Sequence, residues 1–451
     1  MQKCYERYLL PSLQSGQDEV VVVDVGSADV NGGYRTVLAD SRIRYLGVDL
    51  APGPGVDVVA RSPYELPFGD AHADFVLSGQ MLEHSEFFWL VFQEMLRILK
   101  SDGYLFLIAP SAGPIHRFPV DCYRFYPDAF HALARFTGCS VIDIWHDERG
   151  PWRDVVGIFS KQPKPRWSCP ARRITSREEL KAIRGREEEA IKPRLYADRP
   201  DIDRVSGTVP YLELLGTIHQ ELSPRSYLEI GVAKGKSLRL AKCPSIGVDP
   251  APSLDEEALK HAQIYAITSD DFFEFEAARL LARGIDLAFI DGMHHFEYVL
   301  RDFINLERYS TPETLLVVDD IFPNHPVQGL RVRESRIWTG DVWKLYGCLK
   351  KHRSDLILMP VNTSQAGSLL IANLDCANRT LVERYNSIVR EFVPGTPSSP
   401  PTEVLARHDV IEPHDPRILD LLRLLHGLRE GHSDMQLTRQ QLLEFLKKLH
   451  K

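Results

Sequence analysis

The stretch Ser226-Tyr-Leu-Glu-Ile-Gly-Val-Ala-Lys-Gly-Lys-Ser237, followed by Ser245-Ile-Gly-Val-Asp249, decides the fold of this chain. It predicts a buried strand, a glycine turn, a helix and a second strand that ends in an acid. A related layout lies near the start, where Val20-Val-Val-Val-Asp24-Val-Gly26-Ser27 is followed by Tyr45-Leu-Gly-Val-Asp49. Two such layouts predict two crevices of the nucleotide-binding type.

Bulk properties narrow the class of protein. A length of 451 residues indicates about two to four domains. The net charge of −8 gives no electrostatic case for nucleic-acid binding. No apolar run is long enough to predict a membrane span, and the first residues lack the apolar core of a signal peptide. The seven cysteines are scattered without a CxxC pair, which argues against a zinc or disulfide framework. We therefore expect a cytoplasmic protein.

Alternating strand and helix patterns predict two α/β domains, each with a Rossmann-like, seven-stranded and mostly parallel sheet. The strand candidates of the first domain are 20–25, 44–49, 56–60, 74–78, 103–109, 140–146 and 154–160, with helices at 1–14, 33–40, 85–100 and 127–137. Those of the second are 226–230, 245–249, 263–267, 285–290, 314–318, 355–361 and 367–373, after a helix at 211–222.

The predicted boundaries follow from composition. The first domain covers 1–162, a charged linker with a solvated helix covers 163–205, and the second domain covers 206–393. Residues 394–451 form a proline-rich linker and a helical tail. Apolar residues at helical spacing in that tail predict two helices that pack on a domain or on a second copy, so a homodimer through them is one of the expected arrangements.

Three ligand classes compete for the two crevices. A dinucleotide fold requires G-x-G-x-x-G, which neither glycine turn provides. A phosphate-binding P-loop requires four residues before Gly-Lys-Ser, whereas Gly231 is followed by three. The third class places an acid two residues before the first glycine, as Asp24 precedes Gly26 and Glu229 precedes Gly231. A carboxylate there suits a cationic ligand better than a pyrophosphate.

This third arrangement resembles motif I of the class I S-adenosylmethionine-dependent methyltransferases. In the first domain Leu66-Pro-Phe, Asp74-Phe-Val-Leu-Ser78, Met81-Leu-Glu-His84 and the run from Glu94 to Tyr104 are similar to further motifs of that family, although Ser27-Ala28-Asp29 departs from its glycine-rich loop. The resemblance implies S-adenosyl-L-methionine as cofactor. The residues implied to bind it are Asp24, Gly26, Asp49, Ser62, Glu229, Gly231, Gly235, Ser237, Asp249, Ser269 and Asp270.

The second domain resembles a particular branch, the magnesium-dependent O-methyltransferases that act on sugars of macrolide and aminocoumarin antibiotics. The resemblance rests on Ile290-Asp291-Gly-Met-His294-His-Phe-Glu297-Tyr298 and on Val317-Val-Asp319-Asp320. It implies that Asp291, Asp319 and Asp320 bind Mg²⁺, and carboxylate oxygens are the ligands that this cation prefers. His294 is a candidate catalytic base. Asp341 and Lys344 follow the acid pair and are candidates for substrate contact.

The first domain carries a polar and aromatic segment, 110–126, after its fifth strand, where a typical connection is short. We expect it to line an acceptor site through Arg117, Asp121 and Arg124. His84 or His116 is the candidate general base, because histidine titrates near neutral pH. No acid pair follows the fifth strand, so no metal is expected in this half.

The chain is thus expected to be a tandem methyltransferase that methylates oxygens of a sugar or polyol, as a small molecule or glycan, without nucleic-acid partners. A second hypothesis is that one half is a non-catalytic module that binds a glycan or a partner enzyme. The altered glycine loop favours the first half for this role. A third, a nucleotide-sugar dehydrogenase or epimerase, requires NAD and the glycine pattern that is missing here.

Overall fold

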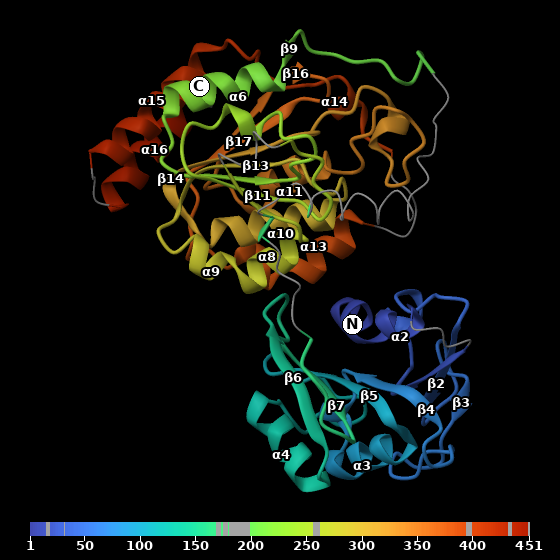
Figure 1. Ribbon diagram of the computed structural model, residues 1–451. Helices are drawn as coiled ribbons and strands as arrows, with labels where there is room; N and C mark the ends of the chain where they lie inside the picture. The colour runs from blue at the N-terminus through green and yellow to red at the C-terminus, as the bar shows by residue number, and fades with distance from the viewer. Residues whose placement is uncertain are drawn as a thin grey trace. The chain divides into compact units, whose positions relative to one another are not determined.

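The computed structural model describes residues 1–14, 19–30, 32–167, 173–174, 179, 199–255, 262–393, 399–431 and 435–449. The chain divides into two compact units, and each is described by itself (Figure 1). Unit 1 comprises Met1–Ser168 with Val382–Arg384, and unit 2 comprises Cys169–Leu381 with Tyr385–Lys451.

Unit 1 is built on a seven-stranded sheet in the order β3-β2-β1-β4-β5-β7-β6. The strands are β1 (Val20–Val25), β2 (Ile43–Asp49), β3 (Val58–Val59), β4 (Ala73–Gly79), β5 (Leu99–Ala109), β6 (Ser140–Asp147) and β7 (Asp154–Ser160). All neighbours pair in parallel except β7, which is antiparallel to both β5 and β6. All seven strands predicted for this half are therefore confirmed.

Helices cover both faces of the unit 1 sheet. They are α1 (Gln2–Cys4), the π-helical turn η1 (Tyr5–Leu9), α2 (Leu10–Gln14), α3 (Phe88–Ile98) and α4 (Pro127–Thr137), with short 3₁₀ turns at η2 (Tyr34–Thr36) and η3 (Leu82–His84). Successive β1 side chains point to opposite faces. Val23 and Val25 accordingly pack in the core under α3 and α4, and Val20 and Val22 pack in the core under the N-terminal helix.

Unit 2 has an eight-stranded sheet in the order β15-β17-β14-β13-β10-β11-β12-β8. The strands are β8 (Arg173–Ile174), β10 (Tyr227–Ile230), β11 (Ser245–Val248), β12 (Ala262–Tyr265), β13 (Ile285–Ile290), β14 (Ser310–Val318), β15 (Ile357–Val361) and β17 (Ser368–Ala372); β9 (Val209–Pro210) and β16 (Thr363–Ser364) form a separate pair. The seven predicted strands are present. The eighth, β8, comes from the predicted linker and pairs antiparallel with the edge strand β12, because a parallel sheet leaves that edge open for pairing.

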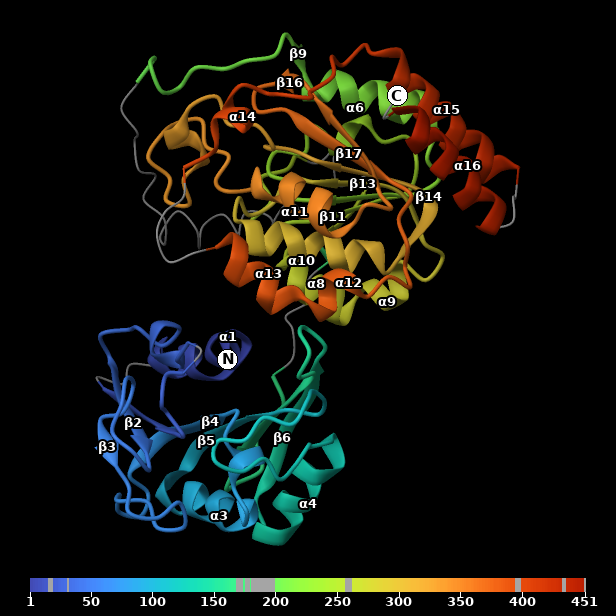
Figure 2. The same cartoon turned by 180° about the vertical axis from the view of Figure 1, so that it is seen from behind.

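The helices of unit 2 lie on the two faces of this sheet, as Figure 2 shows for α6 and α15 on one side and α8, α10 and α13 on the other. Their bounds are α6 (Tyr211–Leu222), α8 (Ser269–Phe275), α9 (Ala277–Leu280), α10 (Phe296–Glu307), α11 (Lys344–His352), α12 (Thr380–Glu383), α13 (Tyr385–Phe392), α14 (Thr402–Leu405), α15 (Pro416–Glu430) and α16 (Met435–Leu449), with 3₁₀ turns at η4 (Leu238–Leu240) and η5 (Pro326–Gly329).

The helix expected after each glycine turn is the main error of the sequence-based prediction. Among the described residues, the first connection of unit 1 contains only η2 instead of a helix over 33–40, and that of unit 2 contains only η4. These connections span residues 26–42 and 231–244. A parallel crossover usually contains an α-helix, so both connections are exceptions to the usual pattern.

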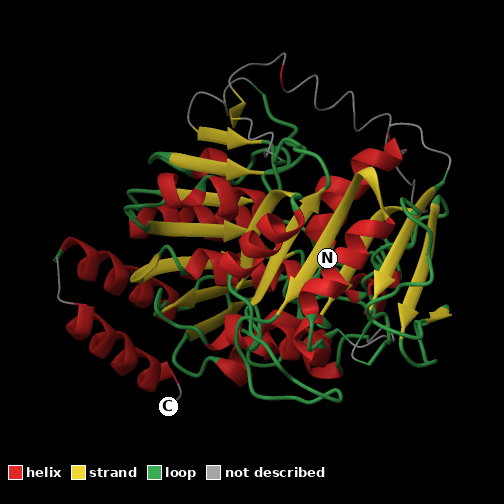
Figure 3. Cartoon of the chain, turned by 90° about the horizontal axis from the view of Figure 1, so that it is seen from below, coloured by secondary structure: helices red, strands yellow, loops and turns green. Residues whose placement is uncertain are grey.

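The C-terminal tail belongs to unit 2. Both predicted tail helices are present, as α15 and α16 (Figure 3). Ile418, Leu421 and Leu425 of α15 are buried in the same core cluster as Leu215 of α6, and Asp415 caps the N-terminus of α15 by accepting from Arg417 N. This confirms that the tail helices pack on a domain.

Two further expectations concern regions that are only partly described. The linker helix predicted near 177–190 lies outside the described residues, apart from residue 179. In the portion of the chain that the structure describes, no helix has the length and apolar character needed to cross a membrane.

Candidate functional site

The glycine turn of unit 2 follows β10 at the point where the sheet order reverses direction, which is where open α/β sheets bind ligands. Gly231 has φ +87°, and a Cβ there would lie 1.9 Å from the carbonyl oxygen of Asp291. Only glycine fits this close approach. The turn therefore places the end of β10 directly against the segment that follows β13.

Two acids hold this turn. Glu229 is fully buried, and its carboxylate accepts from Tyr227 Oη at 2.8 Å and from Ser237 Oγ at 2.7 Å. Asp249 follows β11 and accepts from the backbone N–H of Ala233 at 2.7 Å and of Ala251 at 2.8 Å. The predicted cofactor residues Glu229, Ser237 and Asp249 thus come together around one loop.

Unit 1 repeats this arrangement with different neighbours. Gly26 has φ +82°, and a Cβ there would meet the Met81 side chain at 2.5 Å. Asp49 accepts from Ala28 N at 3.1 Å, as Asp249 does from Ala233. Asp24 is buried and accepts from the hydroxyl of Tyr45 through Oδ2. Within the described residues, its Oδ1 has no hydrogen-bond partner, unlike either oxygen of Glu229.

The residues expected near adenine are placed less uniformly. Ser62 accepts from Tyr64 N at 3.1 Å in the turn after β3. Asp270 forms an ion pair with Arg301 of α10, with Oδ2 2.6 Å from Nη2. Ser269 begins α8, and Gly235 adopts φ +66° beyond the first glycine turn. The ion pair of Asp270 favours a role in fixing α8 on α10 over contact with a ligand.

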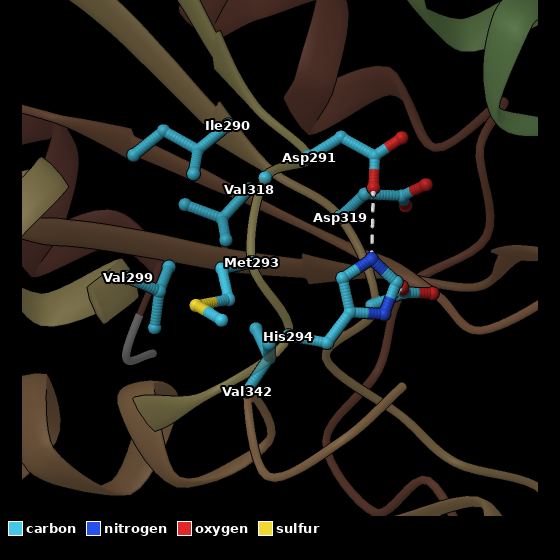
Figure 4. Close-up of a pocket in the computed structure, with 10 residues that line it drawn as sticks. Ile290, Asp291, Met293, His294, Val299, Val318, Asp319 and Val342 are labelled. Atoms are coloured by element: carbon cyan, nitrogen blue, oxygen red, sulfur yellow. Dashed lines mark ion pairs between the residues drawn. The ribbon is translucent and has the colours of Figure 1, made fainter. Parts of the chain in front are cut away.

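Carboxylates and an imidazole meet in one pocket of unit 2. The pocket lies after β13 and β14 and is lined by Ile290, Asp291, Gly292, Met293, His294, Val299, Val318, Asp319, Asp320 and Val342 (Figure 4). Single ligand atoms of Asp291, His294 and Asp320 lie within 4.8 Å of one another. Asp319 lines the same pocket and accepts from Ser368 Oγ of β17 at 2.9 Å. Two of the three predicted metal ligands and the predicted base are therefore close enough to share one ion, and the third ligand, Asp319, lines the same pocket.

The electrostatics of this pocket favour a cation. Burial and the neighbouring acids hold the pKa of Asp291 well above its usual value. Burial, with Asp320 adding to it, raises the pKa of Asp319 to about 7, and burial raises that of Asp320 to about 7. Carboxylates this close disfavour one another's ionised forms unless a positive charge separates them. The donor set of three carboxylates fits a hard divalent cation.

His294 is oriented by its surroundings. Its Nδ1 lies 2.9 Å from the carbonyl oxygen of Trp338 and 3.1 Å from Asp320 Oδ2, and its Nε2 lies 3.7 Å from Asp291 Oδ1. A carbonyl only accepts, so Nδ1 carries the hydrogen and Nε2 keeps its lone pair. Burial lowers the pKa of His294, which keeps the imidazole neutral near pH 7.

Asp341 and Lys344 do not line the pocket. Asp341 is fully buried and accepts from Phe296 N at 2.8 Å, Arg331 Nη1 at 2.8 Å and Lys344 Nζ at 2.9 Å. Its own N–H donates to the carbonyl of His294 at 3.2 Å. These contacts support the His294 segment, and substrate contact by Asp341 and Lys344 stays a prediction. Sequence reasoning missed Ser368, which reaches this region from a distant segment.

In unit 1 the predicted bases lie together. The rings of His84 and His116 meet edge to face with centroids 4.7 Å apart. Asp121 and Arg124 form an ion pair, with Oδ1 2.6 Å from Nη1, and Asp121 also accepts from His116 N at 2.7 Å. Arg117 is exposed. This pairing gives Asp121 and Arg124 a role in shaping the loop around His116.

Comparison with known proteins identifies the two domains. Residues 23–107 match the family model of a methyltransferase domain, and residues 228–321 match a second methyltransferase-domain family. The chain carries two methyltransferase domains in tandem. The second match contains Glu229, Asp249 and the pocket acids, and the first contains Asp24, Asp49 and His84 but ends before His116.

Curated relatives of these methyltransferase domains include two uncharacterized methyltransferases of Mycobacterium leprae, from strains Br4923 and TN, each 34% identical over 98 residues. The match covers 19% of this chain and 36% of each relative, so the chain spans about a third of their length.

Solved structures similar to the chain include two methyltransferases. A 1,6-didemethyltoxoflavin-N1-methyltransferase of Burkholderia thailandensis, bound to S-adenosylhomocysteine, is 17% identical, covers 36% of this chain and 79% of its own, and gives a TM-score of 0.29. A SAM-dependent methyltransferase of Aquifex aeolicus is 15% identical, covers 35% and 91%, and gives 0.25.

Proposed function

We propose that the chain is a tandem S-adenosylmethionine-dependent methyltransferase whose unit 2 methylates a hydroxyl of a sugar or polyol with the help of Mg²⁺. The observation that carries this proposal is the convergence of Asp291, Asp320 and His294 beside the Gly231 turn. The cation that activates the acceptor hydroxyl and the cofactor that supplies the methyl group would then bind at the same edge of the unit 2 sheet.

The cofactor would bind across the Gly231 turn and the end of β11. Asp249 uses its oxygens to accept from two backbone N–H groups, and each carboxylate oxygen has a second lone pair for a ribose hydroxyl. Glu229 lies behind the turn and supplies negative charge near a cationic sulfonium and ammonium.

Asp291, Asp319 and Asp320 would hold the cation, and Ser368 fixes the orientation of Asp319. When bound, Mg²⁺ lowers the pKa of a hydroxyl that it contacts and leaves positions open for substrate. His294 would accept the hydroxyl proton at Nε2, the nitrogen left with a lone pair by the contact of Nδ1 with Trp338. Direct transfer needs positioning and exclusion of water rather than a covalent intermediate.

For unit 1 we propose methyl transfer to an oxygen acceptor, with His84 or His116 as the proton acceptor. The Gly26 turn and Asp49 repeat the arrangement at Gly231 and Asp249, which supports a second cofactor site. A non-catalytic unit 1 is the competing proposal, favoured by the departure of Ser27-Ala28-Asp29 from a glycine-rich loop.

The test uses the full chain and S-adenosylmethionine with an isotopically labelled methyl group, incubated with polyol-rich extracts and analysed by mass spectrometry. We expect labelled methyl ethers, of which those made by unit 2 decrease by about 100-fold or more with a chelator or with Asp319→Ala. Asp420→Ala, an exposed acid of α15, is the control and should leave labelling unchanged.

Labelling of all products that persists unchanged with a chelator and with Asp319→Ala would refute the metal assignment. Calorimetry with S-adenosylmethionine separates the two proposals for unit 1. Two binding sites per chain support twin enzymes, and a single site abolished by Gly231→Ala supports a non-catalytic unit 1.

A further inference from the structure

Unit 1 contains a second grouping of potential metal ligands, formed by Glu83, His84 and His116. One ligand atom from each residue lies within 4.8 Å of the others, and in the described part of the chain only this group and that of Asp291 meet the criterion. Glu83 and His84 belong to the turn η3 after β4, and His116 comes from the loop after β5.

Glu83 is the unusual member of the group. Its side chain is 0% exposed, and among the described residues neither carboxylate oxygen has a hydrogen-bond partner. Burial of a carboxylate without partners is costly, so such a group takes up a proton or neutralises a cation. Arg124 does not neutralise Glu83 through a hydrogen bond, because its guanidinium pairs with Asp121.

The two imidazoles are arranged as ligands would be. His84 Nδ1 lies 2.6 Å from the carbonyl oxygen of Val120, so it donates its hydrogen there and leaves the Nε2 lone pair free. That Nε2 is 3.7 Å from Glu83 Oε1. Asp121 Oδ2 lies 3.4 Å from His116 Nδ1, an ion-pair distance, but within the described residues this nitrogen makes no hydrogen bond. A carbonyl that accepts from the ring, as Val120 does from His84, is typical of histidines that bind metals.

We propose that unit 1 binds a divalent transition cation of the Zn²⁺ class through Glu83, His84 and His116. Two imidazole nitrogens with one carboxylate suit a borderline-soft cation better than Mg²⁺ and leave coordination positions open. The sequence-based expectation of no metal in this half considered only acids after the fifth strand. It overlooked Glu83, which follows the fourth strand.

The location of the group supports a role in the proposed reaction. In unit 1, β4 and β5 occupy the sheet positions that β13 and β14 occupy in unit 2. The two ligand groups therefore arise from the same two connections, at the same edge of equivalent sheets. Use of the cation to polarise an acceptor rests on the proposed methyl transfer, whereas binding of the cation does not. With both imidazoles bound to the cation, the lowered pKa of the acceptor hydroxyl would take the place of the histidine base proposed for unit 1.

The test titrates the full chain, purified without a histidine tag, with ZnCl₂ by calorimetry and with CoCl₂ by visible absorption. Every variant also carries Asp291→Ala and Asp319→Ala, which remove two of the carboxylates that could bind a cation in unit 2. We expect one saturable site per chain and Co²⁺ d–d bands. Glu83→Gln and His84→Ala should each weaken binding by about 100-fold, and Asp121→Asn by about 10-fold. His131→Ala, an exposed histidine of α4, is the matched control and should bind normally.

Absence of a saturable Zn²⁺ or Co²⁺ site, or an affinity unchanged by Glu83→Gln and His84→Ala, overturns the proposal. Should Glu83→Gln fail to fold, His116→Ala gives the same reading, because that side chain is 35% exposed. The labelled-methyl assay separates this proposal from the proposed function of unit 1. If unit 1 transfers methyl groups but the titrations find no Zn²⁺ site, the proposed methyl transfer stands and the proposed cation site is refuted.

Discussion

The two units have equivalent sheets but different chemistry at the edge where ligands bind. The parallel strands follow the same spatial order in both units. An antiparallel strand pairs with the last of them, β7 with β5 in unit 1 and β17 with β14 in unit 2. In unit 2 the connections after β13 and β14 supply three carboxylates and one imidazole, and in unit 1 those after β4 and β5 supply one carboxylate and two imidazoles. The fold therefore determines where a site forms, and a few residues in two connections determine its chemistry.

The glycine turns differ in a second way. Each is tied to an acid at the end of the next strand, Asp49 or Asp249. The acid inside the first strand is fully partnered in unit 2, where Glu229 accepts from Tyr227 and Ser237, but half-partnered in unit 1, where Asp24 accepts from Tyr45. Unit 2 thus holds its loop more tightly, and its cofactor site should be the more rigid of the two.

The largest expected effect concerns the proposed base of unit 2, His294. His294→Ala should lower methyl transfer by unit 2 by about 10²–10⁴-fold, because it removes the proton acceptor. S-adenosylmethionine affinity should change little, since His294 lines the pocket of the acids and is not among the residues proposed to bind the cofactor. Labelled-methyl transfer under saturating cofactor measures the effect.

The adjacent histidine provides the control for this variant. His295 Nε2 lies 3.1 Å from the carbonyl oxygen of Arg331, and His295 is not among the pocket-lining residues. His295→Ala should therefore retain most activity. Equal losses in the two variants would show that the segment, rather than the Nε2 of His294, matters for the reaction.

A stability difference follows from the tail. Leu421 and Leu425 are fully buried between α15 and the rest of unit 2. Leu421→Ala should cost unit 2 about 2–5 kcal/mol through the lost contacts and the cavity. Arg423→Ala, 65% exposed on the same helix, should cost little. Differential scanning calorimetry should show one transition lowered and that of unit 1 unchanged; a shift of both would contradict independent units.

The glycine turns should differ in their tolerance of a methyl group. Both residues have positive φ, which costs alanine about 1–3 kcal/mol. Gly231→Ala also meets a backbone carbonyl at 1.9 Å, whereas Gly26→Ala meets Cγ and Cβ of the Met81 side chain at 2.5 and 2.7 Å. Gly231→Ala should therefore destabilise its unit more. Gly216→Ala, in α6 with open space around it, is the control and should stabilise by up to about 1 kcal/mol.

Much of this molecule could be predicted from local sequence patterns. The central strands were predictable because buried apolar runs such as Val20–Val25 are bounded by glycine and acid. The convergence of Asp291 and Asp319 followed from parallel topology, since the ends of neighbouring strands meet at one edge. Motif order then indicated the cofactor class for both halves.

Other features depend on tertiary placement and could not be predicted from such patterns. Asp341, a candidate for substrate contact, also belongs to a buried network with Arg331 and Phe296 N, which come from other segments. Glu83 was assigned only to a motif, because its isolation from hydrogen-bond donors is a property of the folded loop. The connections after the two glycine turns contain the short turns η2 and η4 instead of the predicted helices, among the described residues.

The smallest expected effect concerns pH and tests the difference between Asp24 and Glu229. Burial raises the pKa of each carboxyl to about 7 in the folded chain. The folded state then holds more protons than the unfolded state between about pH 4 and 7, so both units should lose stability as pH rises through this range.

Cofactor binding should depend on pH in the opposite sense, because the positive charge of S-adenosylmethionine favours the ionised carboxylates. Affinity should rise by about tenfold between pH 5.5 and 8 in unit 1, equivalent to one unit of pKa. The rise should be smaller in unit 2, because the hydrogen bonds from Tyr227 and Ser237 limit how far Glu229 can respond. Calorimetry in two buffers of different ionisation enthalpy measures the released proton. Asp24→Asn should abolish the slope of unit 1 and leave that of unit 2 intact, whereas a slope unchanged by this variant would locate the titrating group elsewhere.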